Sequence, residues 1–443
     1  MASLTSLRAD AREIFAAGVK SADPFAAVTR IVQLQNDRLR VGERSYDLSA
    51  IRNIFIAGCG KGAAPMALAL QTLLGEEICG GVIVVKYGHQ LQLENIEVME
   101  AGHPIPDKAS LRAAREVMGL AARCVQGDTI FFVVTGGGSA LLSCPAEGLS
   151  LEDKQRTTEA LLKSGATIAE VNAVRKHISR IKGGRLAQLA APARVVSLIL
   201  SDVVDDTLDA IASGPTVPDS STYADCAEIM QRYDLRHRVP AAVVKFLDHG
   251  AKGEVAETPK ASDSIFENVQ NIIVGSNRLA LTAARQRAEA LGYHAWVVSD
   301  SMQGESRAVA RSYCVLVKEI MRTNKPISRP ACLLSGGETT VTVRGDGLGG
   351  RNQEFALAAA IESDGLDGVV ILSGGTDGTD GPTAAAGGII DGSTVQRGIA
   401  RNLDPQTFLD RNDSYHFLLA TDDLLLTGPT WTNVMDLQIT LIA

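Results

Sequence analysis

The feature that most constrains the fold is a recurring pattern: a short apolar run leads into glycines and then into an alanine-rich helical segment. The runs at 54–57, 82–85 and 130–134 follow this pattern in the first half of the chain. Strand, glycine turn and helix in this order are typical of parallel βαβ units, whose sheet carries helices on both faces. Strands of the same kind are expected later, at 272–274, 295–298, 331–334, 368–372 and 437–442.

The length of 443 residues exceeds what one hydrophobic core usually serves, so two domains are expected. Residues 1–45 predict two amphipathic helices, because apolar residues recur there at three- and four-residue spacing. The pattern of strands pauses over 216–270, where Pro, Ser, Asp and charged residues are frequent. We therefore predict an N-terminal domain at 1–240 and a C-terminal domain at 241–443.

Charge and hydropathy argue against several classes of protein. The formal net charge is -8, and no block of like charges occurs, so nucleic-acid binding is not expected. No run of about 18 apolar residues is present, and the N-terminal segment lacks the apolar core of a signal peptide. The seven cysteines are scattered singly, which predicts neither a disulfide framework nor a zinc site. These features predict a cytoplasmic enzyme with no membrane partner.

The first glycine-rich turn has the sequence GCGKGA at 58–63 and joins a strand to a helix. The free N–H groups of a helix start attract anions, and Lys61 adds a full positive charge. Gly58 and Gly60 would let the backbone approach a phosphate. The string also fits the GxGxxA dinucleotide fingerprint, but the second strand ends in Lys86 where that fingerprint needs an acidic residue. A phosphate site, a nicotinamide site and a structural turn all stay open.

The second turn contains three consecutive glycines, Gly136, Gly137 and Gly138, followed by Ser139. Such a run is entropically costly in a folded chain, and the cost is reasonable where a ligand must touch the backbone. Ser139 would add a hydroxyl to the same site. A tight turn without a ligand is the alternative.

The third turn contains Gly336, Gly337 and Glu338 and leads to a predicted helix start at Gly350 and Arg351. An arginine at the start of a helix is electrostatically unfavourable, because the helix dipole there favours anions. A bound anion would remove this conflict, and a guanidinium is suited to phosphate. A surface ion pair is the alternative for Arg351.

Carboxylates follow two further predicted strands. Asp377 and Asp380 lie in a glycine-rich loop, where they could bind Mg²⁺ through oxygen or simply form turns. Asp202 ends a strand and could accept the proton of a substrate hydroxyl, bind metal or cap a helix.

A helical segment at 172–179 has the sequence NAVRKHIS and carries several polar groups. Asn172, Arg175 and Ser179 share one face of the predicted helix, and Lys176 starts a neighbouring face. The basic groups of this segment could meet a carboxylate.

Several glycine turns, a lysine, an arginine and loop carboxylates are together what phosphoryl transfer needs. The sequence has no GxxxxGK[ST] motif and no HRD or DFG set, so the common phosphate-transfer scaffolds are excluded. It also has no HExxH or GxSxG motif, which argues against a zinc peptidase and an α/β-hydrolase. The residues alone indicate a two-domain enzyme that acts on a phosphorylated ligand.

The sequence resembles the glycerate 2-kinases whose C-terminal half is a MOFRL-type domain. Nine motifs in the same order carry the resemblance over nearly the whole chain. They are GCGKGA at 58–63, GHPIPD at 102–107, TGGGSALL at 135–142, NAVRKHIS at 172–179, SDV with IASGPT at 201–216, SGGETTVTV at 335–343, GGRNQE at 349–354, GGTDGTDGPTAAAGG at 374–388 and LTGPTWTNVMDL at 426–437.

The resemblance implies two Rossmann-like three-layer α/β/α domains with mostly parallel sheets and an interdomain cleft. It also implies an ATP- and Mg²⁺-dependent kinase that converts D-glycerate to 2-phospho-D-glycerate. Family members have often been labelled hydroxypyruvate reductases, so an NAD(P)H-dependent reductase is the alternative. The sequence does not fix the oligomeric state, and a homodimer is compatible with it.

Carried over residue by residue, the family's catalytic lysine and arginine fall on Lys61 and Arg351. Asp202 and Asp377 are implied as metal-binding or proton-handling positions. The residues expected to contact the nucleotide or line the cleft are Gly58, Gly60, Gly136, Gly137, Gly138, Ser139, Asn172, Gly336, Gly337 and Glu338.

The chain departs from the family pattern at four positions. Asp205 stands where a glycine is usual, and Ala384 stands where an aspartate is usual. Trp431 and Met435 replace a small residue and an asparagine. The first two changes bear on the electrostatics around a metal, and Trp431 bears on the size of the substrate pocket.

Overall fold

The structure is a computed structural model that describes residues 3–443, so the first two residues of the predicted N-terminal domain lie outside it. The chain forms two compact units. The N-terminal unit comprises Pro24–Ser201 and Asp206–Val274. The C-terminal unit comprises the residues up to Asp23, Asp202–Asp205 and Gly275–Ala443. Each unit is built on its own six-stranded sheet.

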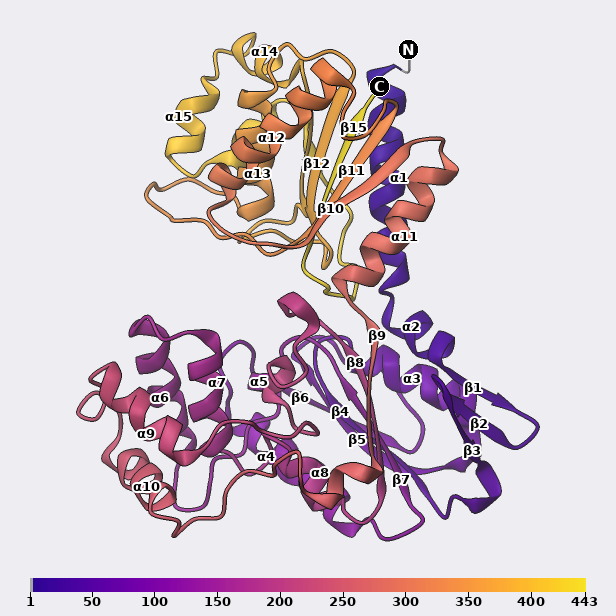
Figure 1. The fold of residues 1–443 in the computed structure, drawn as a ribbon, viewed down its shortest axis with the longest axis vertical. Coiled ribbons are helices and arrows are strands. Elements are labelled where there is room, and N and C mark those ends of the chain that lie inside the picture. Colours follow the sequence, from indigo (N-terminus) through magenta and orange to yellow (C-terminus); the bar gives the residue numbers. More distant parts are fainter. Residues whose placement is uncertain (1–2) are drawn as a thin grey trace. The chain divides into compact units, whose positions relative to one another are not determined.

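The sheet of the N-terminal unit has the strand order β6-β5-β4-β7-β8-β9 (Figure 1). The neighbouring strands from β6 to β8 all pair in parallel, as the sequence predicts. Most of their residues are buried, because helices cover a parallel sheet on both faces. The strands are β4 (Ile54–Cys59), β5 (Ile78–Lys86), β6 (Ile96–Ala101), β7 (Thr129–Val134), β8 (Arg194–Leu200) and β9 (Val269–Gly275).

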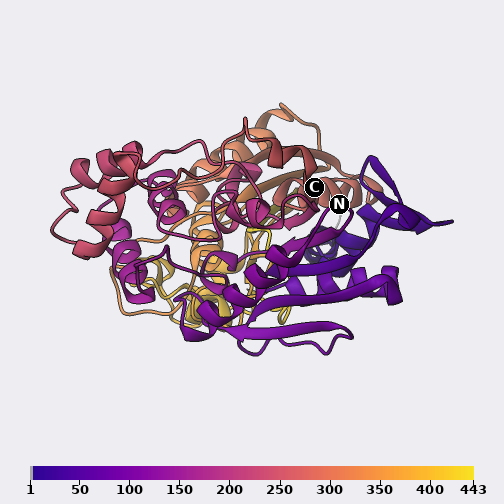
Figure 2. The same ribbon diagram turned by 90° about the horizontal axis from the view of Figure 1, so that it is seen from below.

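The helices of this unit divide into two groups. One group precedes, connects or follows the strands, and the other gathers at the end of the unit opposite a small antiparallel sheet at residues 32–47 (Figure 1; Figure 2). The first group is α2 (Pro24–Ile31), α3 (Ala63–Leu74), α4 (Lys108–Arg123), α5 (Gly138–Leu141) and α8 (Arg185–Ala190). The second group is α6 (Leu151–Lys163), α7 (Ile168–His177), α9 (Tyr223–Arg232) and α10 (Ala241–Ala251).

The prediction of two helices over residues 1–45 is only partly correct. Helices α1 (Leu4–Ser21) and α2 form, but an antiparallel sheet of three strands follows them. Its first turn contains Asn36 and Asp37, both with positive φ (46° and 60°), which is the backbone that a tight hairpin requires. The three strands are β1 (Val32–Gln35), β2 (Arg38–Val41) and β3 (Arg44–Asp47).

The C-terminal unit has the strand order β10-β11-β15-β12-β13-β14. Only β10 and β11 pair in parallel, so the prediction of a mostly parallel sheet is wrong here. The reason is the last strand, β15, which inserts antiparallel between β11 and β12. The strands are β10 (His294–Met302), β11 (Ala331–Gly337), β12 (Val369–Gly375), β13 (Gly387–Asp391), β14 (Leu424–Leu425) and β15 (Asp436–Ile442).

Helices cover both faces of this second sheet, which confirms the predicted α/β class. Helices α1 and α11 lie on one face, and α12 and α13 lie on the other (Figure 1). The helices not yet placed are α11 (Asn277–Ala290), α12 (Ser306–Thr323), α13 (Arg351–Glu362), α14 (Thr394–Ile399), α15 (Pro405–Asp410) and α16 (Ser414–Ala420). Short 3₁₀ turns occur at Leu48–Ala50, Gly75–Glu77, Val204–Asp206, Ile211–Ser213 and Ser264–Asn268.

The two units do not divide where the sequence places the domain boundary. Helix α1 buries Leu7, Ile14 and Phe15 and packs on α11 and the second sheet, so it joins the C-terminal unit. Residues 241–274 remain with the N-terminal unit, because α10 packs on α9 and β9 completes the first sheet. The stretch at 216–270 therefore belongs to one unit, where α9 and α10 bury apolar residues such as Tyr223 and Leu247, and it is not a linker. Within residues 3–443, no helix has both the length and the apolar character needed to cross a membrane.

Candidate functional site

The first two glycine-rich turns lie side by side at the carboxyl edge of the N-terminal sheet. Strand β4 ends at Cys59 and its neighbour β7 ends at Val134, so the turns that follow both strands emerge together. The backbone N–H of Lys61 donates to the carbonyl of Gly136 at 3.0 Å, and that of Gly62 donates to Thr135 Oγ1 at 2.9 Å. The structure thus brings together Lys61 and the turn that contains Ser139.

This edge is also the topological switch point of the sheet. After β4 the chain builds outward through β5 to β6, and it then returns to place β7 on the other side of β4. The connections after β4 and β7 therefore lead toward opposite edges of the sheet, although the two turns themselves are hydrogen-bonded to each other. Ligands of open α/β sheets bind at such points.

The glycines of both turns have a packing reason that the sequence did not reveal. A Cβ on Gly58 would lie 2.3 Å from the carbonyl oxygen of Val133, and one on Gly60 would lie 2.1 Å from Thr135 Oγ1. A Cβ on Gly138 would lie 2.8 Å from Cys59 Sγ. The glycines let the two turns approach each other, whether or not a ligand touches them. Their contact with a nucleotide stays a prediction.

A cluster of cationic side chains surrounds Lys61. Burial first, and then the positive charges of Lys61, Lys86 and His89, lower the pKa of His103 to about 4. The ring of His103 also contacts the second turn, since a Cβ on Gly137 would lie 2.8 Å from its Cδ2. His103 is therefore neutral at pH 7, and the positive potential around it favours a bound anion.

Predicted residues Ser139 and Asn172 belong to one chain of polar contacts. Ser139 Oγ lies 3.1 Å from Ser213 Oγ, and the Ser213 hydroxyl donates to Asn172 Oδ1 at 3.2 Å. The guanidinium of Arg175 donates to the same oxygen at 3.5 Å. Helix α7 thus presents Asn172 and Arg175 toward the second turn, from the face that the sequence predicts.

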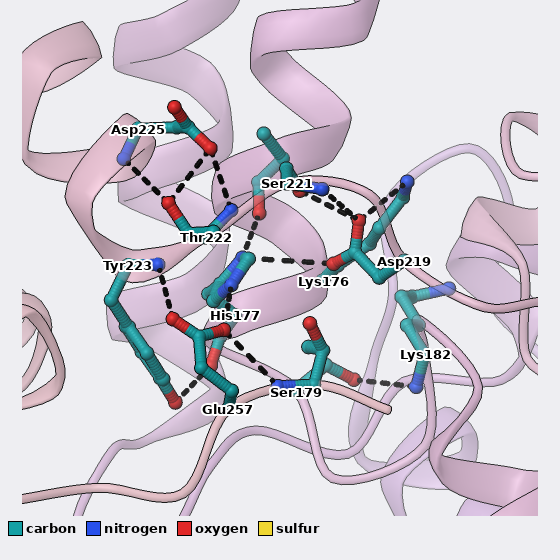
Figure 3. A network of polar contacts seen from close by, with 12 residues as sticks. Lys176, His177, Ser179, Lys182, Asp219, Ser221, Thr222, Tyr223, Asp225 and Glu257 are labelled. Atoms are coloured by element: carbon teal, nitrogen blue, oxygen red, sulfur yellow. Dashed lines mark hydrogen bonds and ion pairs between the residues drawn. The ribbon is translucent and has the colours of Figure 1, made fainter. Parts of the chain in front are cut away.

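The other basic residues of α7 face a different network (Figure 3). Lys176 Nζ lies 2.9 Å from Asp209 and 3.2 Å from Asp219, and His177 lies 3.1 Å from Glu257. These groups meet carboxylates of the chain itself, so they stabilise the fold. The Ser179 hydroxyl donates to the carbonyl of Cys144 at 3.2 Å and does not join Arg175.

In the C-terminal unit, Arg351 begins helix α13 and forms a bidentate ion pair with Asp436. Its Nε and NH2 donate to the two carboxylate oxygens at 2.6 Å and 2.9 Å, and its NH1 lies 3.1 Å from Glu338. Asp436 begins β15 and lies in register between Gly337 and Gly375. Because β15 runs antiparallel, its first residue lies at the edge where β11 and β12 end.

Carboxylates around Arg351 resolve its conflict with the helix dipole. Asp380 accepts backbone N–H groups of Asn352 at 3.2 Å and Gln353 at 2.8 Å, in the first turn of α13. Burial, and then the charge of Asp436, raise the pKa of Asp380 to about 6. Burial also raises the pKa of Asp436, although Arg351 opposes it. The ion pair that the sequence left as the alternative for Arg351 is thus present, because the protein supplies its own anions, and a contact of Arg351 with phosphate stays a prediction.

A cavity of about 570 Å³ opens beside these groups, with Glu338, Arg351 and Asp380 in its wall. Asp377 lies half-buried in the turn after β12, where its Oδ1 accepts from the backbone and hydroxyl of Thr379 at 3.0 Å and 3.1 Å. Within residues 3–443, no three His, Cys, Asp or Glu side chains are grouped to hold a metal ion. Mg²⁺ often uses only one or two protein carboxylates, with water and phosphate as its other ligands.

Gly336 and Gly337 lie inside strand β11 and not in a loop, which corrects the predicted turn. A Cβ on Gly336 would lie 1.8 Å from Asn277 Oδ1, and one on Gly337 would lie 2.3 Å from the carbonyl oxygen of Met302. Both glycines are explained by close packing within the unit. Their contact with a nucleotide stays a prediction.

Asp202 lies just after β8, in the short segment Asp202–Asp205 that groups with the C-terminal unit.

Three departures from the family pattern share one backbone feature. Asp205, Trp431 and Met435 have positive φ angles of 61°, 62° and 67°. Glycine and asparagine are favoured in this conformation, which explains why small residues are usual there. Ala384 is exposed.

Sequence reasoning missed four functional candidates: His103, Lys154, Lys182 and Asp436. Lys154 carried a signal, because it lies on the same face of α6 as Thr157 and Leu161, which are buried. A lysine on the apolar stripe of a helix is unusual unless its charge has a use. Asp436 carried no signal in the sequence, because only the register of β15 in the sheet brings it to Arg351.

Comparison with known proteins gives consistent matches. The family described as "Domain of unknown function (DUF4147)" matches residues 10–248, and the MOFRL family matches residues 331–436. The chain is 44% identical to a D-glycerate 2-kinase from Thermotoga maritima, over 88% of this chain and 90% of that protein. It is 41% identical to a glycerate 2-kinase from Pyrococcus horikoshii, over 96% and 94%. A crystal structure of a glycerate kinase from Thermotoga maritima matches with a TM-score of 0.89 at 41% identity, covering 99% of this chain and 100% of that one.

Proposed function

The chain belongs to the glycerate 2-kinase family, and we propose that it phosphorylates D-glycerate at the 2-hydroxyl with ATP as the donor. The hydroxyl oxygen of glycerate attacks the γ-phosphorus, and the bond from that phosphorus to the oxygen bridging to the β-phosphate breaks. ADP leaves with that oxygen, and the hydroxyl proton passes to a carboxylate. The products are 2-phospho-D-glycerate and ADP.

The observation that carries this proposal is the position of Lys61 at the topological switch point of the N-terminal sheet. The turns after β4 and β7 lie together there, and Lys61 and Lys86 make the region around the neutral His103 positive. Phosphoryl transfer needs fixed cations at the place where charge develops on the phosphate oxygens. We assign Lys61 to this role.

The remaining roles follow from the chemistry of each group. Arg351 is assigned to a second phosphate contact, through guanidinium N–H groups that can turn from Glu338 toward a phosphate. Asp202 is assigned to the hydroxyl proton and, with Asp377, to Mg²⁺, because carboxylate oxygens suit both tasks. Mg²⁺, when bound, would neutralise part of the charge on the phosphate oxygens. The oxygen of Asp377 that does not accept from Thr379 is the one suited to it.

We also propose a cytoplasmic location. All seven cysteines are free thiols, and six of them are buried, which suits a reducing compartment. No oligomeric state is assigned.

The test is ADP release on addition of D-glycerate and ATP, measured by a coupled assay. Lys61→Ala is expected to lower turnover by at least about 100-fold, because it removes a cation that stabilises the transition state. Lys245→Ala is the matched control, since Lys245 is an exposed lysine of α10 in the same unit, and its turnover should equal that of the wild type.

The rival reductase activity is measured with the same preparations. Oxidation of NADH by hydroxypyruvate, without any release of ADP from ATP and D-glycerate, would overturn the proposal. ADP release that Lys61→Ala leaves unchanged would overturn the role of Lys61 alone.

A further inference from the structure

The N-terminal unit contains a second cavity, of about 480 Å³, next to the turn that carries Ser139. Its wall combines the proline-rich segment after His103 with hydroxyl and cationic side chains. The residues that bear on its chemistry are Pro104, Pro106, Ser139, Ser143, Lys154 and Arg175. Neither Lys154 nor Ser143 has a part in the phosphate contacts described above.

Lys154 lies on the buried face of α6, with only 3% of its surface exposed. Its ammonium nitrogen has no hydrogen-bond partner among the described residues. The same is true of Arg175 Nε and of the hydroxyl of Ser143. Buried polar groups are nearly always satisfied in proteins, so three unsatisfied donors in the wall of one cavity indicate a missing acceptor.

The charges point to the same conclusion. Burial, and then the positive charge of Arg175, lower the pKa of Lys154 to about 7. Lys182 is fully buried and lies close to Lys154 and Arg175. Its pKa is lowered first by burial and then by the positive charges of these two residues. Cys144 is the other titratable group that affects the pKa of Lys154. Glu159 and Lys163 also line the cavity, but they form an exposed ion pair with each other at 2.6 Å. No carboxylate contributes to the pKa of any of the three buried cations.

Three cations without a counter-charge are costly to bury, and proteins normally pair such groups or neutralise them. An anion with two or more acceptor oxygens would remove the repulsion and satisfy the unpaired donors together. A carboxylate has these properties, because it only accepts hydrogen bonds and has four lone-pair sites. The hydroxyl of Ser143 adds a neutral donor of the kind that holds a small polar ligand.

We propose that this cavity binds the carboxylate of the hydroxy-acid substrate, with Lys154, Arg175 and Ser143 as its donors. The identity of the acid rests on the proposed function. Ser139 links the cavity to the phosphate region, because it follows Gly136, whose carbonyl accepts from the backbone of Lys61. In a 2-hydroxy acid the reacting oxygen is on the carbon next to the carboxylate, so anchoring the carboxylate also positions that oxygen.

The experiment is calorimetric titration of the full chain with D-glycerate, which does not depend on turnover. Lys154→Met keeps the length and apolar character of the stem, and it is expected to weaken binding by at least about 30-fold, as for loss of one partner of a buried charge pair. Arg156→Met is the matched control, because Arg156 is an exposed cation on the same helix. Its affinity should stay within about twofold of the wild type, since exposed charges contribute little. Ser143→Ala, a smaller change, should weaken binding by about fivefold, the loss of one neutral hydrogen bond.

Proton uptake gives a readout that a merely structural role of Lys154 would not change. At pH 8 the amine of Lys154, with its pKa of about 7, is largely neutral, and a bound carboxylate would raise that pKa. Binding to the wild type should therefore take up protons, as seen from titrations in buffers of different ionisation enthalpy. Binding to Lys154→Met should not.

The inference is overturned if D-glycerate does not bind the wild type, or if it binds Lys154→Met and the wild type equally. It is also overturned if Lys154→Met loses affinity for ATP and keeps its affinity for D-glycerate, since the cavity would then hold a nucleotide phosphate. A wild type that binds D-glycerate through Lys154 but releases no ADP would contradict the proposed function and leave this carboxylate site standing.

Discussion

The two units surround their key cations in opposite ways. In the N-terminal unit, Lys154, Arg175 and Lys182 lie close together, and no carboxylate of the described residues forms an ion pair with them. In the C-terminal unit, Arg351 is held by Asp436 and Glu338. One unit carries uncompensated positive charge, and the other carries positive charge that its own carboxylates already neutralise.

This difference indicates what each unit can bind. Uncompensated buried cations favour an anion directly, because the anion relieves their repulsion. A cation that is already paired with carboxylates attracts a bare anion less strongly. The surrounding carboxylates instead favour a ligand that carries its own metal ion, such as a magnesium nucleotide. The contrast therefore predicts the acid substrate on the N-terminal unit and makes the C-terminal acids candidates for the metal side of the nucleotide.

The strongest test of this contrast removes one cation from each unit and measures the free energy of unfolding by chemical denaturation. Arg351→Met leaves the fully buried Asp436 without its partner, so the free energy of unfolding should fall by about 3–5 kcal/mol. Lys154→Met removes an unpartnered buried amine, so the free energy of unfolding should stay equal or rise by about 1 kcal/mol.

A double variant checks the cause of the loss at Arg351. Arg351→Met with Asp436→Asn removes both charges of the pair and should recover more than half of the lost stability, without restoring ADP release. Equal losses of stability in Arg351→Met and Lys154→Met would contradict the proposed contrast between the units.

A second prediction concerns the crowding of carboxylates in the C-terminal unit. Because the pKa of Asp380 is raised from 3.8 to about 6, the folded chain holds this proton more tightly than the unfolded chain. The stabilising contribution is complete below pH 3.8 and is lost as the pH rises to about 6. The wild type, compared with Asp380→Asn, should therefore lose on the order of 2 kcal/mol of unfolding free energy over this range. Denaturation at several pH values in metal-free buffer measures it, and a constant difference between the two proteins would contradict it.

The smallest expected effect concerns the loop that leads into Asp436. Trp431 is 54% exposed and has a φ of 62°, a backbone that bulky residues rarely adopt. Trp431→Gly should be more stable than Trp431→Ala by about 1 kcal/mol, because only glycine adopts this backbone without cost. Both variants lose the same side chain, so thermal unfolding of the pair isolates the backbone effect. Equal stability would mean that the loop relaxes to another conformation.

Some of the candidate site could be predicted residue by residue. Lys61 and Ser139 each follow an apolar run that ends in glycines, and the sequence shows this. That β4 and β7 are neighbours, so that their turns lie together, is known only from the strand order. The role of the glycines could not be inferred in this way. The same residues that would let a phosphate approach also let the turn at Gly60 approach Thr135, and a sequence does not distinguish the two uses.

Arg351 and Lys154 show the limits of the sequence in two other ways. Arg351 was correctly placed at a helix start, but its compensating carboxylate lies 85 residues further along the chain. Lys154 was not singled out, although it lies on the face of α6 that Thr157 and Leu161 bury, because the burial of that face is known only from the structure.

The sequence by itself determined the α/β class, the parallel pairing of strands in the first sheet and the glycine-rich turns that follow them, because these depend on local periodicity and on short connections. Only the tertiary structure decided that β15 inserts antiparallel, that α1 belongs to the C-terminal unit, and which cations are paired. These features depend on contacts between residues far apart in the chain. When such contacts are buried, a paired charge and an unpaired charge differ greatly in free energy, and no local sequence pattern shows which of the two is present.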